Sequence, residues 1–215
     1  SVQRQAKPTI VDAILPAKQD RSREKRDRLL RAGAETFALK GYDETRISDI
    51  AKAANLSVGT FYQRFKDKRT FFDALNEDFV LHASNEVELF FAEIDSDCTA
   101  RLLLKSFVEM SRDFITQNVG YIRAMLTLAP REKGILDPLI VTDQLAADLL
   151  EAELLKRKLI KPGALRTGQV YFACGVMKKT LVVMTNNDSG PYFADDDKTI
   201  DELIEVMATY LSVKT

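Results

Sequence analysis

The segment from Thr45 to Phe65, TRISDIAKAANLSVGTFYQRF, constrains the fold more than any other part of the chain. Its first half repeats apolar residues at the i, i+3, i+4, i+7 spacing of a helix, and Thr45 is a plausible N-cap for that helix. Asn55 follows at once, and asparagine tolerates the left-handed backbone of an abrupt turn. Ser57 can then cap a second short helix. The inward positions of the first helix are Ile47, Ile50, Ala51 and Ala54.

Longer helices are predicted on both sides of this pair. An apolar stripe that begins at Ser22 predicts a helix ending at Gly41, where a left-handed residue is favoured. On the other side, Asp67 can cap a long helix that reaches about Ile94. Three helices with an abrupt turn between the second and third, followed by a long fourth, are the organisation of a helix-turn-helix domain.

The third short helix combines a small, polar start with an aromatic end. Ser57, Val58, Gly59 and Thr60 have short side chains, which would let the N-terminus of this helix approach DNA closely. The aromatic residues Phe61 and Phe65 lie at i, i+4 and therefore share one face, which we predict packs into the core.

At these positions the chain resembles the DNA-binding domain of the TetR family of bacterial transcriptional regulators. The resemblance covers residues 22–75 and consists of F-A-x-x-G-Y, T-x-x-x-I-A and S-x-G-T-x-Y-x-x-F, followed by a lysine that opens the next helix. It implies an all-α homodimer, most often a repressor of a palindromic operator. It also implies a variable C-terminal domain that binds a small molecule, which releases the protein from DNA.

The resemblance also implies which residues contact DNA. Thr45, Tyr62 and Lys68 would contact phosphates, with the Tyr62 hydroxyl directed outward, and Gln63 lies where it can reach a base. Asn55 stands where the family often has glycine. Gln63 and Arg64 stand where an aromatic residue or histidine is frequent, so the base preference is open. The full set of predicted DNA contacts is Thr45, Arg46, Ser57, Val58, Gly59, Thr60, Tyr62, Gln63 and Lys68.

Charge is distributed unevenly along the chain. Residues 1–70 hold 16 Lys and Arg against 9 Asp and Glu, whereas the remainder holds 15 against 23. A basic surface attracts DNA by neutralising phosphates and releasing counterions, although charged runs are also common on solvated faces. Both interpretations remain open for the basic residues before and in the first helix: Lys18, Arg21, Arg23, Lys25 and Arg26.

The rest of the chain is also predicted to be helical. We expect helices at 99–117, 121–129, 137–158, 162–185 and 198–213, because apolar residues recur there at helical spacing and no strand-like alternation stands out. The predicted organisation is all-α. A flexible arm at 1–20 precedes a helix-turn-helix domain at 21–70, and a helical effector-binding and dimerisation domain follows at 71–215.

Two sets of candidates lie in this C-terminal part. The first set is aromatic residues and methionines of the middle helices, which would line a pocket for a largely apolar effector: Phe107, Met110, Phe114, Tyr121, Met125, Tyr171 and Met177. In TetR-like proteins the last two long helices pair with their copies in the partner subunit. The second set, predicted for that homodimer interface, is Cys174, Leu181, Met184, Leu203, Met207 and Tyr210.

Other functional classes find little support in the sequence. One histidine and two distant cysteines argue against a zinc site, and no glycine-rich phosphate loop or catalytic triad spacing occurs. We therefore expect no cofactor, no metal and no enzyme activity. The absence of a long apolar run or a signal-like N-terminal stretch predicts a cytoplasmic protein with no membrane partner. The alternatives are an activator or architectural DNA binder and, behind these, a helical carrier or enzyme.

Overall fold

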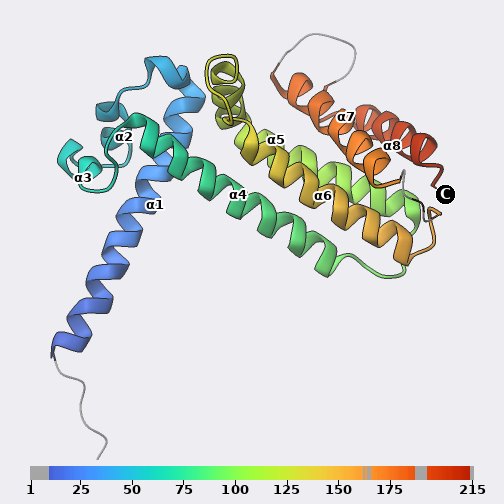
Figure 1. The fold of residues 1–215 in the computed structure, drawn as a ribbon, viewed down its shortest axis with the longest axis horizontal. Coiled ribbons are helices and arrows are strands. Elements are labelled where there is room, and N and C mark those ends of the chain that lie inside the picture. Colours follow the sequence, from blue (N-terminus) through green and yellow to red (C-terminus); the bar gives the residue numbers. More distant parts are fainter. Residues whose placement is uncertain (1–9, 162, 164–165, 187–192, 214–215) are drawn as a thin grey trace, which may run out of the picture. The chain divides into compact units, whose positions relative to one another are not determined.

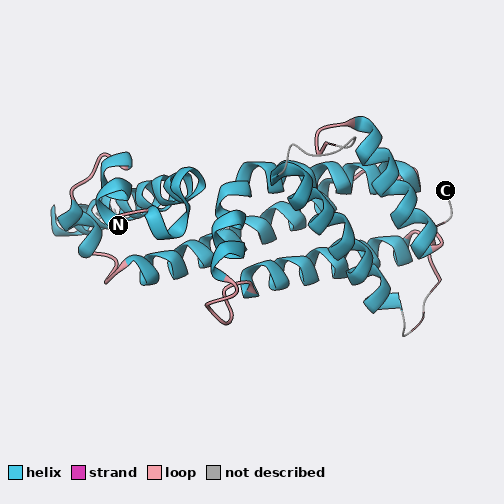
Figure 2. Cartoon of the chain, turned by 90° about the horizontal axis from the view of Figure 1, so that it is seen from above, coloured by secondary structure: helices cyan, strands magenta, loops and turns pink. Residues whose placement is uncertain are grey.

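The structure, a computed structural model, describes residues 10–161, 163, 166–186 and 193–213. Within them it contains eight α-helices and no strand, so the all-α prediction is confirmed (Figures 1 and 2). The chain divides into two compact units, one up to Leu75 and one from Asn76 onward. None of the described helices is both long enough and apolar enough to cross a membrane.

The N-terminal unit consists of α1 (Ile10–Glu44), α2 (Ile47–Ala53), α3 (Val58–Tyr62) and the start of α4 (Lys68–Glu93). The regular part of α1 ends at Gly41, whose φ of 74° is the left-handed conformation predicted there. The helix begins at Ile10, well before the predicted start at Ser22, so residues 10–20 are helical rather than part of an arm. The first nine residues of the predicted arm lie outside the described residues.

An aromatic cluster forms the core of this unit. The Phe71 ring of α4 lies 5.1 Å from the Phe61 ring and 4.9 Å from the Phe65 ring, measured between centroids. Phe37 of α1 packs edge-on against Phe72 at 5.3 Å. All five side chains are buried, and such ring pairs add to the free energy gained from burying their area. The cluster therefore fixes α3 against α1 and α4.

The C-terminal unit adds α5 (Ala100–Leu128), α6 (Asp137–Lys156), α7 (Arg166–Asn186) and α8 (Asp197–Leu211) to the rest of α4. Helix α7 packs against α5, α6 and α8, and α8 also packs against α5. The predicted helices 99–117 and 121–129 are a single helix, α5, which passes through the buried Gly120. Glycine costs a helix only about 1 kcal/mol, so packing along the whole length outweighs it.

Candidate DNA-binding surface and effector pocket

The turn between α2 and α3 has the geometry that the sequence predicts. Asn55 adopts φ of 52°, in the left-handed region. Its N–H donates to the Lys52 carbonyl at 2.9 Å, and the N–H of Leu56 donates to the Ala51 carbonyl at 2.9 Å. These two bonds form a Schellman motif, which ends α2 abruptly and turns the chain into α3. From α1, Arg28 Nη2 donates to the Ala54 carbonyl at 2.7 Å and holds the turn in place.

The start of α3 is capped as predicted and is open to solvent. Ser57 Oγ accepts a hydrogen bond from the Thr60 N–H at 3.1 Å and lies 2.9 Å from Thr60 Oγ1. Val58 is 41% exposed and Gly59 is exposed. A Cβ on Gly59 would have only Ser57 Oγ, at 3.7 Å, within 4 Å among the described atoms. Nothing in the described fold therefore requires glycine here, and the space in front of it is free for a partner.

Helix α3 presents opposite faces to the core and to solvent. Phe61 is fully buried, whereas the adjacent Tyr62 is 55% exposed, as the sequence predicts. Gln63, the C-cap residue, is also exposed. Arg64 instead turns back into the unit, where Nη1 donates to the Thr60 carbonyl at 3.1 Å and Nη2 to Ser22 Oγ at 3.3 Å. Of the two residues that depart from the family pattern, Gln63 is therefore the one available to a base.

Thr45 does not have the role predicted for it. It is 1% exposed, and its hydroxyl donates to the Gly41 carbonyl at 2.6 Å. The N-cap of α2 is Arg46, whose N–H donates to Asp49 Oδ2 at 3.0 Å. That hydrogen bond, together with Lys40, lowers the pKa of the Asp49 carboxyl. Arg46 itself is exposed, as a residue that contacts DNA must be.

Lys68 is directed into the unit rather than toward a phosphate. Its Nζ donates to the carbonyls of Tyr42 at 2.8 Å, Thr45 at 3.0 Å and Asp43 at 3.3 Å. It also lies 4.5 Å above the Tyr42 ring. Burial lowers the Lys68 pKa, and the carboxylates of Asp43 and Glu44 partly oppose that shift. An ammonium has three donors, so these carbonyls use all of them, and the side chain of Lys68 joins α4 to the end of α1.

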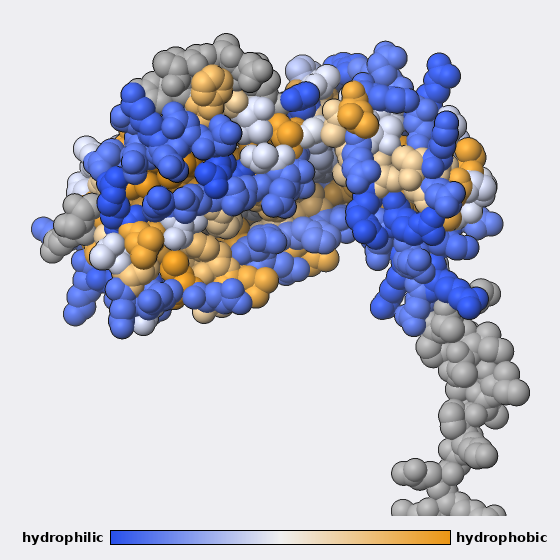
Figure 3. Space-filling model, turned by 180° about the vertical axis from the view of Figure 1, so that it is seen from behind, coloured by the Kyte–Doolittle hydropathy of each residue, from blue (hydrophilic) through white to orange (hydrophobic). Residues whose placement is uncertain are grey.

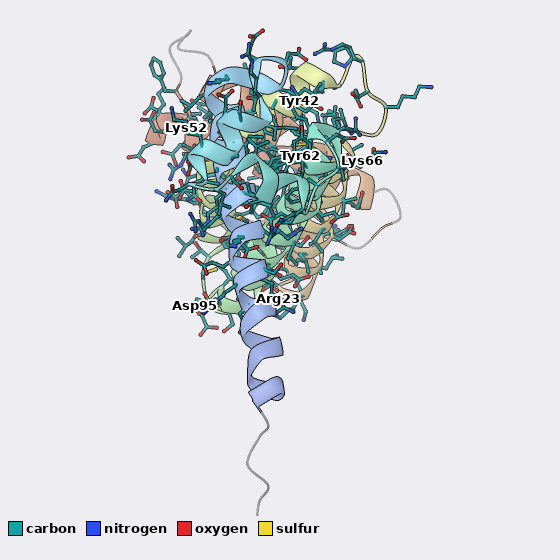
Figure 4. All side chains as sticks on the ribbon, turned by 90° about the vertical axis from the view of Figure 1, so that its left-hand side faces the viewer. Arg23, Tyr42, Lys52, Tyr62, Lys66 and Asp95 are labelled. Carbon is teal, nitrogen blue, oxygen red and sulfur yellow. The ribbon has the colours of Figure 1, made fainter. Side chains whose placement is uncertain are left out.

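Two lysines absent from the predicted set lie on the exposed surface near α3. Lys52 of α2 and Lys66, just before α4, are both exposed. In Figure 4 they lie with Tyr62 on the side of the N-terminal unit that faces the viewer. Both lysines lie within residues 22–75, the segment that resembles the TetR family. This position could have identified them from the sequence, because a lysine flanking a recognition helix can neutralise a phosphate.

A cavity of about 450 Å³ lies within the C-terminal unit. Its wall is mainly apolar and comes from α4, α5, α6 and α7, and it includes Phe79 and Val87 of α4, Ile140 of α6 and Val182 of α7. The volume is within the range of pockets that bind small molecules. Three of the predicted effector residues line this cavity: Met110, Phe114 and Tyr171. The other four, Phe107, Tyr121, Met125 and Met177, do not line it and are buried in the core.

Polar groups are few in the cavity wall. Lys178 Nζ donates to Asp143 Oδ1 at 2.9 Å, and both side chains are mostly buried. The hydroxyl of Ser111, on α5, has no hydrogen-bond partner among the described residues. Glu86 and Lys179 are exposed residues of the same wall.

Most of the residues predicted for a dimer interface belong to the core of their own chain. Cys174 and Leu181 are fully buried, and burial raises the pKa of the Cys174 thiol to about 12, which keeps it protonated. Met184 is half-buried. Only Leu203, Met207 and Tyr210 line a surface groove, between α7 and α8.

The exposed apolar residues of that groove come from other helical positions. Phe172 is 58% exposed, Val206 is 54% exposed, and the Phe172 ring lies 5.7 Å from the ring of Tyr210. Figure 3 shows apolar patches among the hydrophilic surface of the C-terminal unit, while the N-terminal unit is mainly hydrophilic from this side. The two helices named for the interface therefore do carry an exposed apolar surface, but most of the residues predicted for the interface face inward, and the interface itself stays a prediction.

Comparison with known proteins agrees with this geometry. Residues 29–75 match the family model of bacterial regulatory proteins of the tetR family. YvdT of Bacillus subtilis, an uncharacterised HTH-type transcriptional regulator, is 34% identical over 64 residues, and YdgC of the same organism is 38% identical over 56 residues. These alignments span 30% and 26% of this chain and about a third of each relative, 33% and 29%.

Solved structures extend the likeness to the whole fold. GusR of Salmonella enterica superposes with a TM-score of 0.65 at 19% identity, covering 87% of this chain and 95% of that protein. FadR of Bacillus subtilis, solved in complex with stearoyl-CoA, gives 0.65 at 19% identity, with 85% and 97% covered. A TetR-family regulator of Streptomyces coelicolor gives 0.69 at 15% identity, with 87% and 79% covered. Residues 29–75 therefore match the tetR family of bacterial regulatory proteins, and the all-helical fold of the chain is similar to those of solved TetR-family regulators.

Proposed function

We propose that this protein is a ligand-responsive repressor that binds a palindromic operator as a homodimer and leaves it when a small molecule occupies the C-terminal cavity. The observation that carries the proposal is the outward face of α3, where Tyr62 and Gln63 are exposed behind an open Gly59. A helix presented in this way fits the major groove, which is wide enough to admit it. Such a protein acts on chromosomal DNA, so we expect it in the cytoplasm.

Dimerisation follows from the number of base pairs that one α3 can contact. A single helix of five residues reaches only a few base pairs, whereas two related by a dyad bind half-sites about 34 to 36 Å apart. The exposed groove of Phe172, Val206 and Tyr210 offers an apolar surface that a second copy related by that dyad could cover. The structural relative FadR was solved with stearoyl-CoA, which supports a small-molecule role for the C-terminal unit.

Release from DNA requires a ligand that distinguishes two conformations. In one conformation the two α3 helices match the operator, and in the other they do not. A molecule that binds the mismatched conformation more tightly lowers the affinity for the operator, at most by the ratio of its affinities for the two conformations. No catalytic step is part of this mechanism. We therefore expect the molecule to leave unchanged.

Fluorescence polarisation and footprinting on the DNA that flanks the gene would test the proposal. We expect a short, palindromic protected site and loss of binding for Tyr62→Ala. Diffuse protection at low salt would instead indicate an architectural binder and overturn the proposal. A specific footprint that raises transcription in a reporter assay would identify an activator, which is the second candidate.

A further inference from the structure

The hydroxyl of Ser111 is the most unusual group in the cavity wall. Ser111 is 4% exposed, and its Oγ has no hydrogen-bond partner among the described residues. Helical serines and threonines ordinarily donate to the carbonyl four residues earlier. Thr142, in the same wall, does so to Pro138 at 3.0 Å, and Thr36 does so to Ala32 at 2.6 Å. A buried hydroxyl without a partner is unfavourable, so a ligand group that hydrogen-bonds to it gains an interaction that the empty protein lacks.

The charges of the wall cancel. Asp143 and Lys178 form an ion pair at 2.9 Å with side chains only 21% and 17% exposed, and the exposed Glu86 and Lys179 are also opposite in sign. The Lys178 ammonium already binds the Asp143 carboxylate. A ligand carboxylate that approached Lys178 would therefore also come close to Asp143, which repels it. At Lys178 it would lose its hydration without gaining a free counterion, which is costly in an apolar cavity, and the ammonium of Lys179 is exposed, so solvent screens its charge. A carbonyl or hydroxyl oxygen has no such cost, because Lys178 keeps two of its three N–H donors.

We infer that the cavity binds an uncharged, mainly apolar molecule with one hydroxyl or carbonyl group, which hydrogen-bonds to Ser111, and that Asp143 excludes carboxylates. The inference rests on the proposed ligand-responsive function and specifies the chemistry of its effector. A volume of about 450 Å³ accommodates an apolar body, and the aromatic and aliphatic wall provides its contacts.

Matched ten-carbon probes test this inference on the full chain. Decan-2-one, decan-1-ol and decanoate share an apolar body and differ in the charge and hydrogen-bonding of one end. Each would be titrated against the protein by displacement of the neutral dye Nile red. We expect the ketone or the alcohol to bind at least tenfold more tightly than decanoate. Tighter binding of decanoate, or displacement by none of the three, would overturn the inference.

Two variants locate the discriminating groups. Ser111→Ala should weaken the preferred neutral probe about tenfold, while the thermal midpoint of the empty protein stays the same or rises because an unsatisfied hydroxyl is gone. Asp143→Asn leaves Lys178 uncompensated, so the affinity for decanoate should rise relative to that for the ketone. Ser106→Ala, on the same helix but outside the wall, is the matched control and should change neither. Unchanged probe binding in Ser111→Ala, or a lower midpoint without a ligand, would show a structural role and refute the assignment.

The same probes separate this inference from the proposed function. If the neutral probe binds but does not release the operator, the chemistry of the cavity is confirmed and the proposed ligand response fails. If decanoate releases the operator and the neutral probes do not, the proposed function survives and the inference is wrong.

Discussion

Replacing Gly59 by alanine should separate DNA binding from folding. A Cβ at Gly59 meets only Ser57 Oγ at 3.7 Å, an ordinary contact, so the fold accepts the methyl group. Alanine is favoured over glycine in a helix by up to about 1 kcal/mol, which predicts an unchanged or slightly higher stability. On DNA, the methyl group lies between α3 and the groove. Overpacked contacts cost about 1 to 3 kcal/mol each, so two copies of α3 should lose at least about 2 kcal/mol, or about 30-fold in affinity.

Gly33→Ala is the matched control, and here we expect the substitution to lower the stability of the fold. A Cβ at Gly33 would lie 2.3 and 2.4 Å from two atoms of the Phe71 ring, which must then move by more than 1 Å. That ring is fully buried and packs against Phe61 and Phe65, so such a movement would disturb these contacts. The overpacking cost of about 1 to 3 kcal/mol exceeds the helix gain, so the thermal midpoint should fall by several degrees.

Circular dichroism melting and fluorescence polarisation with the footprinted operator measure the two quantities. We expect weak DNA binding at full stability for Gly59→Ala and reduced stability for Gly33→Ala. If Gly59→Ala bound the operator as tightly as the parent, or lost affinity only in proportion to lost stability, the open space at α3 would not be the DNA-binding surface.

Further perturbations test other parts of the structure. Lys68→Met should destabilise the protein by about 1 to 3 kcal/mol in urea melts, because three carbonyls lose their donor. Asp49→Asn should cost stability above pH 3.8, and the difference from the parent should vanish as the pH falls through the lowered folded pKa of Asp49, which denaturation at several pH values would show. Phe172→Asp should convert the proposed dimer into monomers in sedimentation experiments, whereas the substitution Phe193→Asp, at an exposed residue outside the groove, should leave the proposed dimer intact.

Local signals were sufficient to predict the helix-turn-helix but not its side-chain partners. The left-handed Asn55 and the cap at Ser57 follow from residue type and spacing, because both depend on neighbours within a few positions. The partners of Lys68 could not be predicted in this way, because its acceptors lie more than twenty residues away in sequence. Thr45 has an acceptor only four residues away, at Gly41, but its burial depends on how the rest of the unit packs around it.

The inward position of most residues predicted for the dimer interface has a related reason. Helix α7 packs against three helices of its own chain, so apolar residues occupy most of its circumference. The stripe through Cys174 and Leu181 faces inward, while Phe172 and Val176 face solvent. Helical spacing identifies apolar stripes but does not distinguish a stripe that covers its own core from one that covers a partner.

Whether a side chain faces its own chain or the solvent also decides how many cations can neutralise DNA. Counting charges in the N-terminal part overestimates the contacts, because Lys68 donates within the unit and Lys40 is paired with Asp49 of α2, whereas Arg46, Lys52 and Lys66 are exposed beside the two short helices. Three contacts from each of two subunits predict a slope of log K against log salt of about −5. The same measurement shows whether the exposed basic residues at 21–26 of α1 also contact phosphates, since each additional contact per subunit steepens the slope by nearly 2. A slope near −5 that is unchanged in Arg23→Gln would leave these residues solvated, whereas a steeper slope that this variant reduces would place α1 on the DNA.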